Sequence, residues 1–305
     1  MMKKRLRWAS AATVVAVLTS LGISAYAEDV SQDGADDVAA VVASAAPSTD
    51  LSAPPEVEGD QVVASADDVK AVVPLSPEEE IRVTAPTADG VRTASIELPD
   101  EFDVERGQVA DDGTVVYSTN DGGGDAVAVQ TLADGATRIQ TVIGSPSSAH
   151  EFGYRMDGYQ PYQSDTGEVI FLNEAGEYIP IAAPWATDAN GDAVETRYEV
   201  RGDELFQVVV SNESTAYPVV ADPTWQWLGP AWGMKLTRSE TSRVRNYAAA
   251  LGMCALFTKK IAIRACGVFG SYIVAQANIA EGEKPKSCLF FTAAPVPGII
   301  WKVPC

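Results

Sequence analysis

The sequence predicts a multi-domain chain: an antiparallel all-β domain, built as a sandwich or barrel, precedes a small disulfide-stapled α-helical domain, and a disordered N-terminal segment precedes both. Short β-type runs separated by Asn-Gly and Asp-Gly turns fill residues 83–225. Apolar residues then follow helical spacing, and all four cysteines of the chain lie in that last part. The expected boundaries are 1–27, 28–82, 83–225 and 226–305.

The first 27 residues have the pattern of a secretory signal peptide. MMKKRLRW supplies a positive start, ASAATVVAVLTSLGI an apolar core, and SAYAED the small residues Ala25 and Ala27. We expect cleavage after Ala27 and an extracellular, soluble mature protein. The alternative, an uncleaved anchor, is disfavoured because the apolar core is shorter than a spanning helix.

Residues 28–82 are rich in Ala, Val, Asp, Glu, Ser and Pro, and 28–80 hold no aromatic residue. Such a composition buries too little apolar surface to offset the entropy of ordering, so we predict a disordered acidic spacer. A weak repeat runs through it: VVASA occurs at 41–45 and 62–66, and DDVAAVV at 36–42 is echoed by DDVKAVV at 67–73.

Residues 83–225 contain β-type runs rich in branched and aromatic residues, several with alternating polarity. The runs are VRTASIEL, TVVYST, AVAVQTL, TRIQTVI, EVIFL, TRYEV and ELFQVVV. Turn sequences such as NDGGGD, ADG, NEAG and RGD separate them. Many short strands without a long amphipathic helix predict the sandwich or barrel.

Residues 226–305 change in texture. Thr237 to Glu240 has the spacing of a helix capping box, an apolar stripe follows to Thr258, and a second helix is expected from about 261 to 280. The proline-containing tail after it is expected to be extended. An even number of cysteines in an exported chain predicts disulfides among Cys254, Cys266, Cys288 and Cys305.

Four cysteines allow three pairings, and the sequence constrains them only in part. In one continuous helix, Cys254 and Cys266 lie about 18 Å apart and cannot bond. A reversal at 258–260 would instead let them staple a helical hairpin. That turn has no Gly or Pro, so we expect each helix cysteine to pair with Cys288 or Cys305.

Charge divides the chain sharply. Residues 28–225 carry 8 Lys/Arg against 39 Asp/Glu, a net charge of −31, whereas residues 226–305 carry 10 against 3, a net charge of +7. A basic part often meets an acidic partner. The basic domain is therefore expected either to contact anionic membrane or cell-wall polymer, or to dock on the acidic β-rich domain of its own chain.

Six residues are candidates for the envelope contact. Lys259, Lys260 and Arg264 precede an uncharged stretch and suit an anionic surface, although they fit equally the end of a buried helix. Three tryptophans in PTWQWLGPAW suit sugar stacking or a membrane interface, although a seam between domains is the favoured interpretation. They are Trp225, Trp227 and Trp232.

Two stretches carry a resemblance. APWATDANGDAVETRYEVRGDELFQVVV at 183–210 and AYPVVADPTW at 216–225 resemble a group of uncharacterised secreted proteins of actinomycete-type bacteria. In that group a β-rich domain closes with a Y-P-V-V-x-D-P-x-W phrase and variable C-terminal modules follow. TRSET at 237–241 and the cysteine-bearing helical region are similar to one such module. The resemblance covers residues 90–305; it implies an exported two-module protein and no catalytic residues.

No catalytic or metal-binding constellation stands out. His150 is the only histidine and no G-x-S-x-G accompanies it, so we interpret it as a turn or surface residue. DANGD at 188–192 does not fit a calcium loop and is interpreted as a hairpin turn. Phosphate-binding and dinucleotide-binding glycine patterns do not occur, so no cofactor, metal or nucleic-acid partner is expected.

These observations favour a secreted, non-enzymatic protein whose basic module contacts anionic envelope material. A more specific form of this hypothesis gives the module a bacteriocin- or toxin-like activity. One alternative is a secreted hydrolase using paired Asp or Glu side chains of the β-rich domain, which would face each other in a pocket lined by aromatic residues. The other is a purely structural surface protein.

Overall fold

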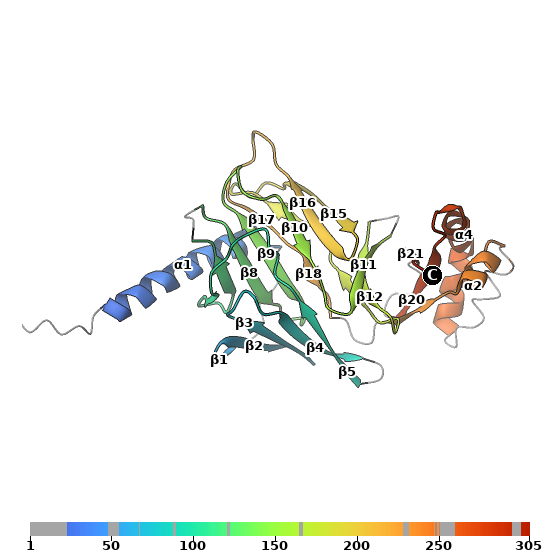
Figure 1. The fold of residues 1–305 in the computed structure, drawn as a ribbon, viewed down its shortest axis with the longest axis horizontal. Coiled ribbons are helices and arrows are strands. Elements are labelled where there is room, and N and C mark those ends of the chain that lie inside the picture. The colour runs from blue at the N-terminus through green and yellow to red at the C-terminus, as the bar shows by residue number, and fades with distance from the viewer. Residues whose placement is uncertain are drawn as a thin grey trace, which may run out of the picture.

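The computed structural model describes residues 23–47, 55–66, 68–87, 90–120, 123–164, 167–227, 232–246, 248, 250, 260–294 and 300–305. Figure 1 shows three parts in a row: the helix α1 (Ile23–Ala45), a large β-rich body, and a small module at the C-terminal end. We call residues 55–227 the β-domain and residues 232–305 the C-terminal module.

The β-domain is antiparallel throughout the strand pairs of its described residues, so the predicted antiparallel all-β class is confirmed for this part. A five-stranded meander has the order β1-β2-β3-β4-β5, and a ten-stranded sheet contains the path β11-β12-β13-β18-β9-β8-β7-β6. A smaller sheet has the order β10-β16-β15, and β14 joins the large sheet through β17.

The seven predicted runs all form strands, whereas the other strands of this domain were not predicted. The strand bounds in this domain are β1 (Glu56–Glu58), β2 (Gln61–Ala66), β3 (Val69–Pro74), β4 (Ile81–Thr87), β5 (Gly90–Ile96), β6 (Gln108–Val109), β7 (Val115–Ser118), β8 (Ala126–Thr131), β9 (Thr137–Ile143), β10 (Glu151–Tyr154), β11 (Tyr159–Gln163), β12 (Val169–Asn173), β13 (Tyr178–Ile181), β14 (Ala186–Thr187), β15 (Glu195–Arg201), β16 (Glu204–Val210), β17 (Val219–Ala221) and β18 (Thr224–Trp225).

One apolar core joins the three sheets. It takes the alternate, inward-facing residues of the strands, such as Val127 and Val129 of β8 and Ile139 and Ile143 of β9. Trp225 lies fully buried within it, with its ring centroid 5.5 Å from that of Tyr154 in an edge-on contact. Alternation of inward and outward residues therefore builds this core, as period-2 patterning requires.

The predicted disorder of residues 28–82 is wrong wherever the structure describes them. Residues 56–82 supply β1 to β3 and the start of β4, with inward-facing residues such as Val62, Ala71, Val73 and Ile81 buried in the shared core. This segment lacks aromatic residues but does not need a core of its own, because neighbouring sheets supply the large side chains. Small apolar residues at every other position of these strands are enough to cover the large side chains of the neighbouring sheets.

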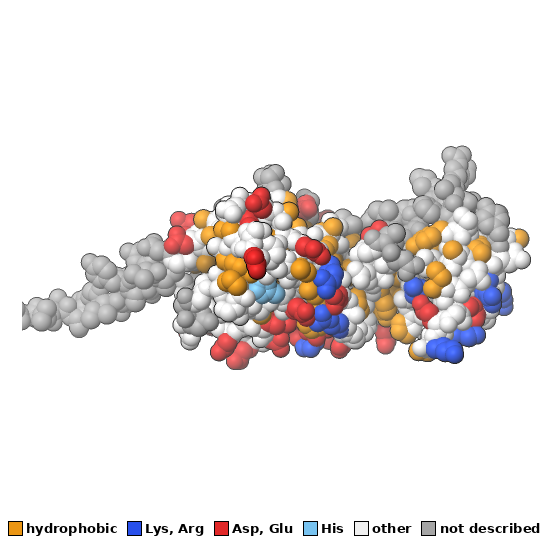
Figure 2. Space-filling model, turned by 90° about the horizontal axis from the view of Figure 1, so that it is seen from above, with side chains coloured by type: hydrophobic (Ala, Val, Ile, Leu, Met, Phe, Trp, Pro, Cys, Tyr) orange, Lys and Arg blue, Asp and Glu red, His pale blue; other side chains and the backbone are white. Residues whose placement is uncertain are grey.

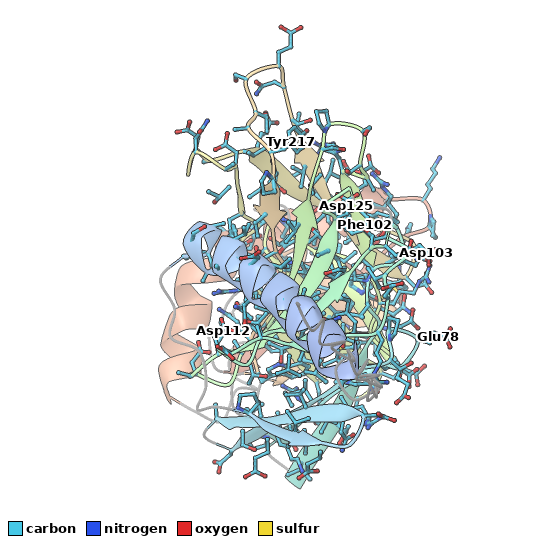
Figure 3. All side chains as sticks on the ribbon, turned by 90° about the vertical axis from the view of Figure 1, so that its left-hand side faces the viewer. Glu78, Phe102, Asp103, Asp112, Asp125 and Tyr217 are labelled. Carbon is cyan, nitrogen blue, oxygen red and sulfur yellow. A yellow bond between two sulfur atoms is a disulfide. The ribbon has the colours of Figure 1, made fainter. Side chains whose placement is uncertain are left out.

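The helix α1 also contradicts that disorder, because it packs on the other face of the large sheet (Figure 3). Its residues Ala35, Ala39 and Val42 are buried against small residues of β7, β8, β9 and β17. The backbone N–H of Asp111 donates to Asp36 Oδ1 at 2.7 Å. Cleavage at the expected point after Ala27 would leave this docked part of the helix in the mature chain.

The C-terminal module is a mixed α/β unit, so the purely helical prediction is wrong. A three-stranded antiparallel sheet in the order β19-β20-β21 packs with two helices. CLFFTAA and IWKV form strands because their aromatic and branched residues favour a pleated surface over the predicted extended tail. The bounds are β19 (Trp232–Lys235), α2 (Arg238–Arg243), α4 (Lys260–Gly282), β20 (Cys288–Ala294) and β21 (Ile300–Val303).

Both helix signals of this module are confirmed in part. Thr237 caps α2 and forms the predicted capping box with Glu240. The second predicted helix is α4, whose residues Ile273, Ala277 and Ala280 are buried in the module core. The apolar stripe to residue 258 lies largely outside the described residues. Among the helices of the described residues, none is long and apolar enough to span a membrane.

One disulfide overturns the predicted cysteine pairing. Cys288 at the start of β20 bonds to Cys305, so neither is free to bond to a helix cysteine. The antiparallel register explains the pairing, because Cys288 lies opposite Val303 and thus close to the chain end. Cys266 falls in α4, and Cys254 lies outside the described residues.

A buried polar group lies beneath Trp185, at the end of β17. Asp222 accepts a hydrogen bond from Thr224 Oγ1 at 2.5 Å and a longer one from the Trp185 backbone N–H at 3.4 Å. Burial raises the pKa of Asp222 to about 7, although the Thr224 hydroxyl and the buried Arg138 guanidinium act in the opposite direction. The carboxyl group is therefore ionised less readily in the folded chain than in the unfolded chain.

Asp222→Asn should remove a pH dependence of stability. Between pH of about 4 and 7 the unfolded chain loses this proton before the folded chain does, so the free energy of unfolding falls as the pH rises and is flat above 7. Between pH 5 and 8, we expect the free energy of unfolding measured with urea to fall by about 3 kcal/mol more for the wild type than for Asp222→Asn. Equal slopes for the two proteins, with exposed Asp103→Asn as control, would contradict the assignment.

Gly233 in β19 has no room for a side chain. An added β-carbon would overlap the Phe290 ring and the backbone carbonyl oxygen of Phe291 on β20. Because a backbone atom cannot move aside, we expect Gly233→Ala to lower the free energy of unfolding by about 1–3 kcal/mol. Gly34 lies within α1, and a β-carbon added there would have no atom within 4 Å. Gly34→Ala should therefore stabilise the chain by up to about 1 kcal/mol, because alanine favours the helix more than glycine does. Calorimetry of both variants measures the difference, and equal melting temperatures would refute it.

Candidate functional site

An apolar seam joins the β-domain to the C-terminal module. Ile170, Leu172 and Tyr178, on one face of β12 and β13, pack with residues of β20 and β21. The module side of this cluster consists of Cys288, Phe290, Trp301 and Val303, all buried. We call these seven residues the seam.

Three aromatic rings form the centre of the seam. The ring centroid of Tyr178 lies 6.2 Å from that of Phe290 and 6.3 Å from that of Trp301, and Phe290 and Trp301 are 6.2 Å apart. Burial raises the pKa of Tyr178 to about 12. A backbone hydrogen bond from Gly233 to the carbonyl oxygen of Gly176, at 3.2 Å, adds a polar link beside the rings.

The predicted tryptophan contacts need correction. Trp225 and Trp227 are buried in the β-domain core, and Trp227 Nε1 donates to Thr137 Oγ1 at 2.9 Å, so neither can meet an external surface or form the predicted seam. Both pack into the core of the β-domain rather than between the two parts. Trp232 starts β19, and its side chain lies outside the described set.

The predicted basic contacts fall at the edge of what the structure describes. Lys260 and Arg264 belong to the first turns of α4, but their side chains lie outside the described residues, as does the whole of Lys259. The structure therefore places two of the three on one helix and leaves their contact with an anionic surface a prediction.

A cleft of about 820 Å³ opens beside the seam. One wall is formed by Asp157 of the β10–β11 turn and by Tyr159, the first residue of β11. Another wall is the β12–β13 turn, with Glu174. Lys235 and Phe290 enter the lining from the C-terminal module. The cleft thus exists only because the two parts are docked.

The cleft carries more negative than positive side chains. Glu80, Glu97, Asp157, Glu174 and Asp203 line it, against Arg155 and Lys235. Arg155 is already ion-paired, with N–O distances of 3.0 Å to Glu204 and 3.7 Å to Glu97. The buried Arg92 donates to the carbonyl oxygen of Tyr178 and is not among the lining residues.

Aromatic groups form the apolar part of the cleft lining. Tyr159 is buried, Tyr162 is half-buried, and burial raises the pKa of both phenol groups. The buried Leu172 and Phe290 of the seam extend the same surface. An apolar floor therefore meets an acidic rim.

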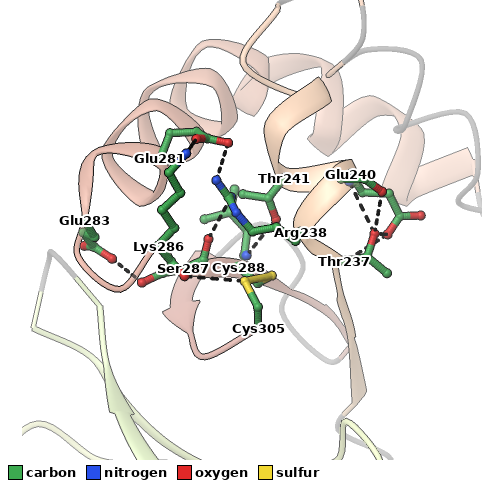
Figure 4. The surroundings of a disulfide bond; sticks show 12 residues. Thr237, Arg238, Glu240, Thr241, Glu281, Glu283, Lys286, Ser287, Cys288 and Cys305 are labelled. Atoms are coloured by element: carbon green, nitrogen blue, oxygen red, sulfur yellow. Dashed lines mark hydrogen bonds and ion pairs between the residues drawn. A yellow bond between two sulfur atoms is a disulfide. The ribbon is translucent and has the colours of Figure 1, made fainter.

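Basic side chains of the C-terminal module fall into two groups. Arg238 and Lys286 both pair with Glu281, at 2.5 and 2.9 Å (Figure 4). Lys302 pairs with Glu283 at 3.3 Å. The hydrogen bond from Lys286, followed by that from Arg238, lowers the pKa of Glu281 to about 2. These cations neutralise the module's own acids.

The second group is unpaired. Arg243 and Lys284 are exposed and form no ion pair within the part of the chain that the structure describes. Figure 2 shows acidic side chains over the β-domain together with a group of Lys and Arg side chains on its side toward the module, and it shows blue side chains along the lower and outer edges of the C-terminal module. The module thus presents positive charge away from the β-domain.

The structure places the two turn candidates clearly. DANGD forms the predicted turn: Asp188 Oδ1 accepts from the N–H groups of Asn190 and Asp192. His150 is half-buried, with Nε2 2.8 Å from the Tyr217 hydroxyl and Nδ1 2.7 Å from the Ser148 carbonyl oxygen. Within the described residues, no group of three or more His, Cys, Asp or Glu could hold a metal ion.

The carboxyl groups with raised pKa values lie elsewhere. Burial raises the pKa of Glu101, whose Oε1 accepts from the Gly153 N–H at 2.9 Å, and burial likewise acts on Asp222. Neither residue lines the cleft. The cleft itself combines Asp and Glu side chains with Tyr159, Tyr162 and Phe290. The alternative of a carboxylate hydrolase, which needs two such acids facing each other in an aromatic-lined pocket, therefore stays a prediction.

Comparison with protein-family models, curated proteins and solved structures found no match for this chain. The resemblance to secreted actinomycete-type proteins therefore stays a prediction. The closing phrase that carries it contains β17 and β18, with Asp222 and Trp225 buried. In this chain the phrase therefore has a structural role in closing the β-domain.

Sequence reasoning missed the cleft residues Tyr159, Tyr162, Glu174 and Lys235. The one sequence feature in this region is the turn motif NEAG at 173–176, which predicts a turn and forms one between β12 and β13. Nothing in the sequence shows that this turn meets β19, because the contact joins segments about 60 residues apart. The cleft forms only where the C-terminal module packs against the β-domain.

A double-mutant cycle tests the seam. Tyr178→Leu and Trp301→Leu each keep an apolar side chain and remove one aromatic ring. We expect a coupling energy of about 1 kcal/mol between the two substitutions in thermal or urea unfolding, because the rings contact each other across the seam. The pair Tyr178→Leu and Ile139→Val, in separate clusters, is the control and should be additive. Additivity of the seam pair would contradict the docking.

Proposed function

We propose that this chain is a secreted, non-enzymatic protein that binds an anionic cell-wall polymer through its C-terminal module. The observation that carries the proposal is the division of the module's surface. Its β20 and β21 face is occupied by the apolar seam, while exposed Arg243 and Lys284 remain without an ion pair in the described residues.

The sign of the charge supports an anionic partner. The module's three acids already have cationic partners or a capping role: Glu281 and Glu283 are ion-paired, and Glu240 accepts from Thr237. Residues 226–305 carry seven more basic than acidic residues by count, and of these basic residues Arg243 and Lys284 are exposed and form no ion pair within the described residues. Phosphate or carboxylate groups of a polymer suit such a surface.

The seam favours an external partner over the β-domain as the target of this charge. Within the described residues, the side-chain contact between the two parts is apolar and aromatic, and no Lys or Arg of one part forms an ion pair with an Asp or Glu of the other. Docking therefore leaves the basic residues available. The disulfide between Cys288 and Cys305 fits an oxidising extracellular setting and supports secretion.

A polymer is favoured over a lipid bilayer. Burial of the α4 residues Ile273, Ala277 and Ala280 in the module's own core leaves that face of the helix unavailable for insertion. Electrostatic binding to a polymer needs no apolar insertion and leaves this core intact. Contact with anionic lipid is the other outcome of the test.

Cosedimentation with cell-wall sacculi that retain their anionic polymers tests the proposal. We expect the chain from Glu28 to bind at about 50 mM salt and to be released at about 500 mM. Arg243→Gln with Lys284→Gln should weaken binding roughly thirtyfold, since each basic group near an anionic surface contributes about 1 kcal/mol and two are removed.

The matched control removes two exposed positive charges from the β-domain, Lys70→Gln with Arg82→Gln. It should bind as the wild type does. Equal weakening by both pairs would show that position on the module does not matter, and failure of the wild type to bind would reject the function. Binding to anionic vesicles but not to sacculi would replace the polymer with a membrane.

A further inference from the structure

We propose that the cleft between the β-domain and the C-terminal module is a second binding site, which takes a lysine- or arginine-bearing peptide segment. Its volume of about 820 Å³ lies in the range of ligand sites. It is built from two separately folded parts rather than from one surface loop. This site is distinct from the outward-facing basic residues, so it does not rest on the proposed polymer binding.

The charges of the cleft select a cation. Glu80, Asp157, Glu174 and Asp203 line it without a side-chain hydrogen bond or ion pair among the described residues. Arg155 is neutralised by Glu97 and Glu204, which leaves Lys235 as the one unpaired cation among the described lining residues. A cationic ligand gains attraction here that a neutral or anionic one lacks.

The apolar floor selects the rest of the ligand. Tyr162, Leu172 and Phe290 lie in the same lining as these carboxylates. Lysine and arginine side chains combine an aliphatic stem with a charged head, so the stem can cover the floor while the head reaches the rim. The face of an aromatic ring attracts a guanidinium or ammonium group further. Metal ions would use the rim but not the floor.

The position of the cleft gives the ligand a consequence for the whole chain. Both parts contribute lining residues, Glu174 from the β-domain and Lys235 with Phe290 from the module. A ligand that contacts both is bound only while the seam is closed. Binding therefore stabilises the docked arrangement and raises the melting temperature.

Titration calorimetry with penta-arginine and penta-lysine peptides tests the site, at about 50 mM salt and with penta-glutamate as the negative peptide. We expect both cationic peptides to bind and to raise the melting temperature. Glu174→Gln with Asp203→Asn should weaken binding roughly three- to tenfold, since exposed ion pairs have modest strength.

The control variant Asp103→Asn with Glu213→Gln removes the same charge from exposed positions outside the cleft lining; Figure 3 shows Asp103 at the edge of the body. Its binding should stay within about twofold of the wild type. Equal weakening by both pairs would reduce the effect to general attraction by an acidic chain. Absence of binding, or binding without a rise in melting temperature, would also overturn the proposal. Sacculus binding by Glu174→Gln with Asp203→Asn should be unchanged, which separates this site from the polymer site.

Discussion

The architecture depends on the apolar contact between β12–β13 and β20–β21. Tyr178, Phe290 and Trp301 fill it, and the disulfide from Cys288 fixes the end of the same strand. Because the contact is apolar, it holds an acidic domain and a basic module together without using their opposite charges. The two consequences are a cleft beside the contact and a set of basic side chains that face away from it.

Local sequence predicted seven of the strands of the β-domain but not which strands lie beside one another. The pentapeptide VVASA shows why: it ends α1 at 41–45 and forms β2 at 62–66. In the first copy, Val42 continues the helical spacing of Ala35 and Ala39, and all three pack on the sheet. In the second copy every other residue is buried, at Val62, Ala64 and Ala66. Five identical residues therefore follow the surface against which they pack. Composition predicted disorder for both copies because it is blind to surfaces supplied by distant segments.

The candidate sites were harder to predict for the same reason. Cysteine count and charge asymmetry identified the module, and the capping box located the start of α2. The tryptophans were assigned by position in the chain, yet Trp225 and Trp227 are buried in the β-domain core. The cleft joins turns and strands far apart in sequence, so no motif marks it. Burial of Asp222 likewise depends on Trp185 and Arg138, which belong to other strands or connections.

The central claim is that the module is held by apolar contact rather than by opposite charge. Small-angle X-ray scattering of the chain from Glu28, at low and at high salt, tests it most directly. Apolar docking predicts the same radius of gyration at about 50 mM and at about 500 mM salt, because screening weakens charge attraction but not burial of the seam. A clear increase in the radius of gyration at high salt would show that opposite charges hold the two parts together, and would contradict the account.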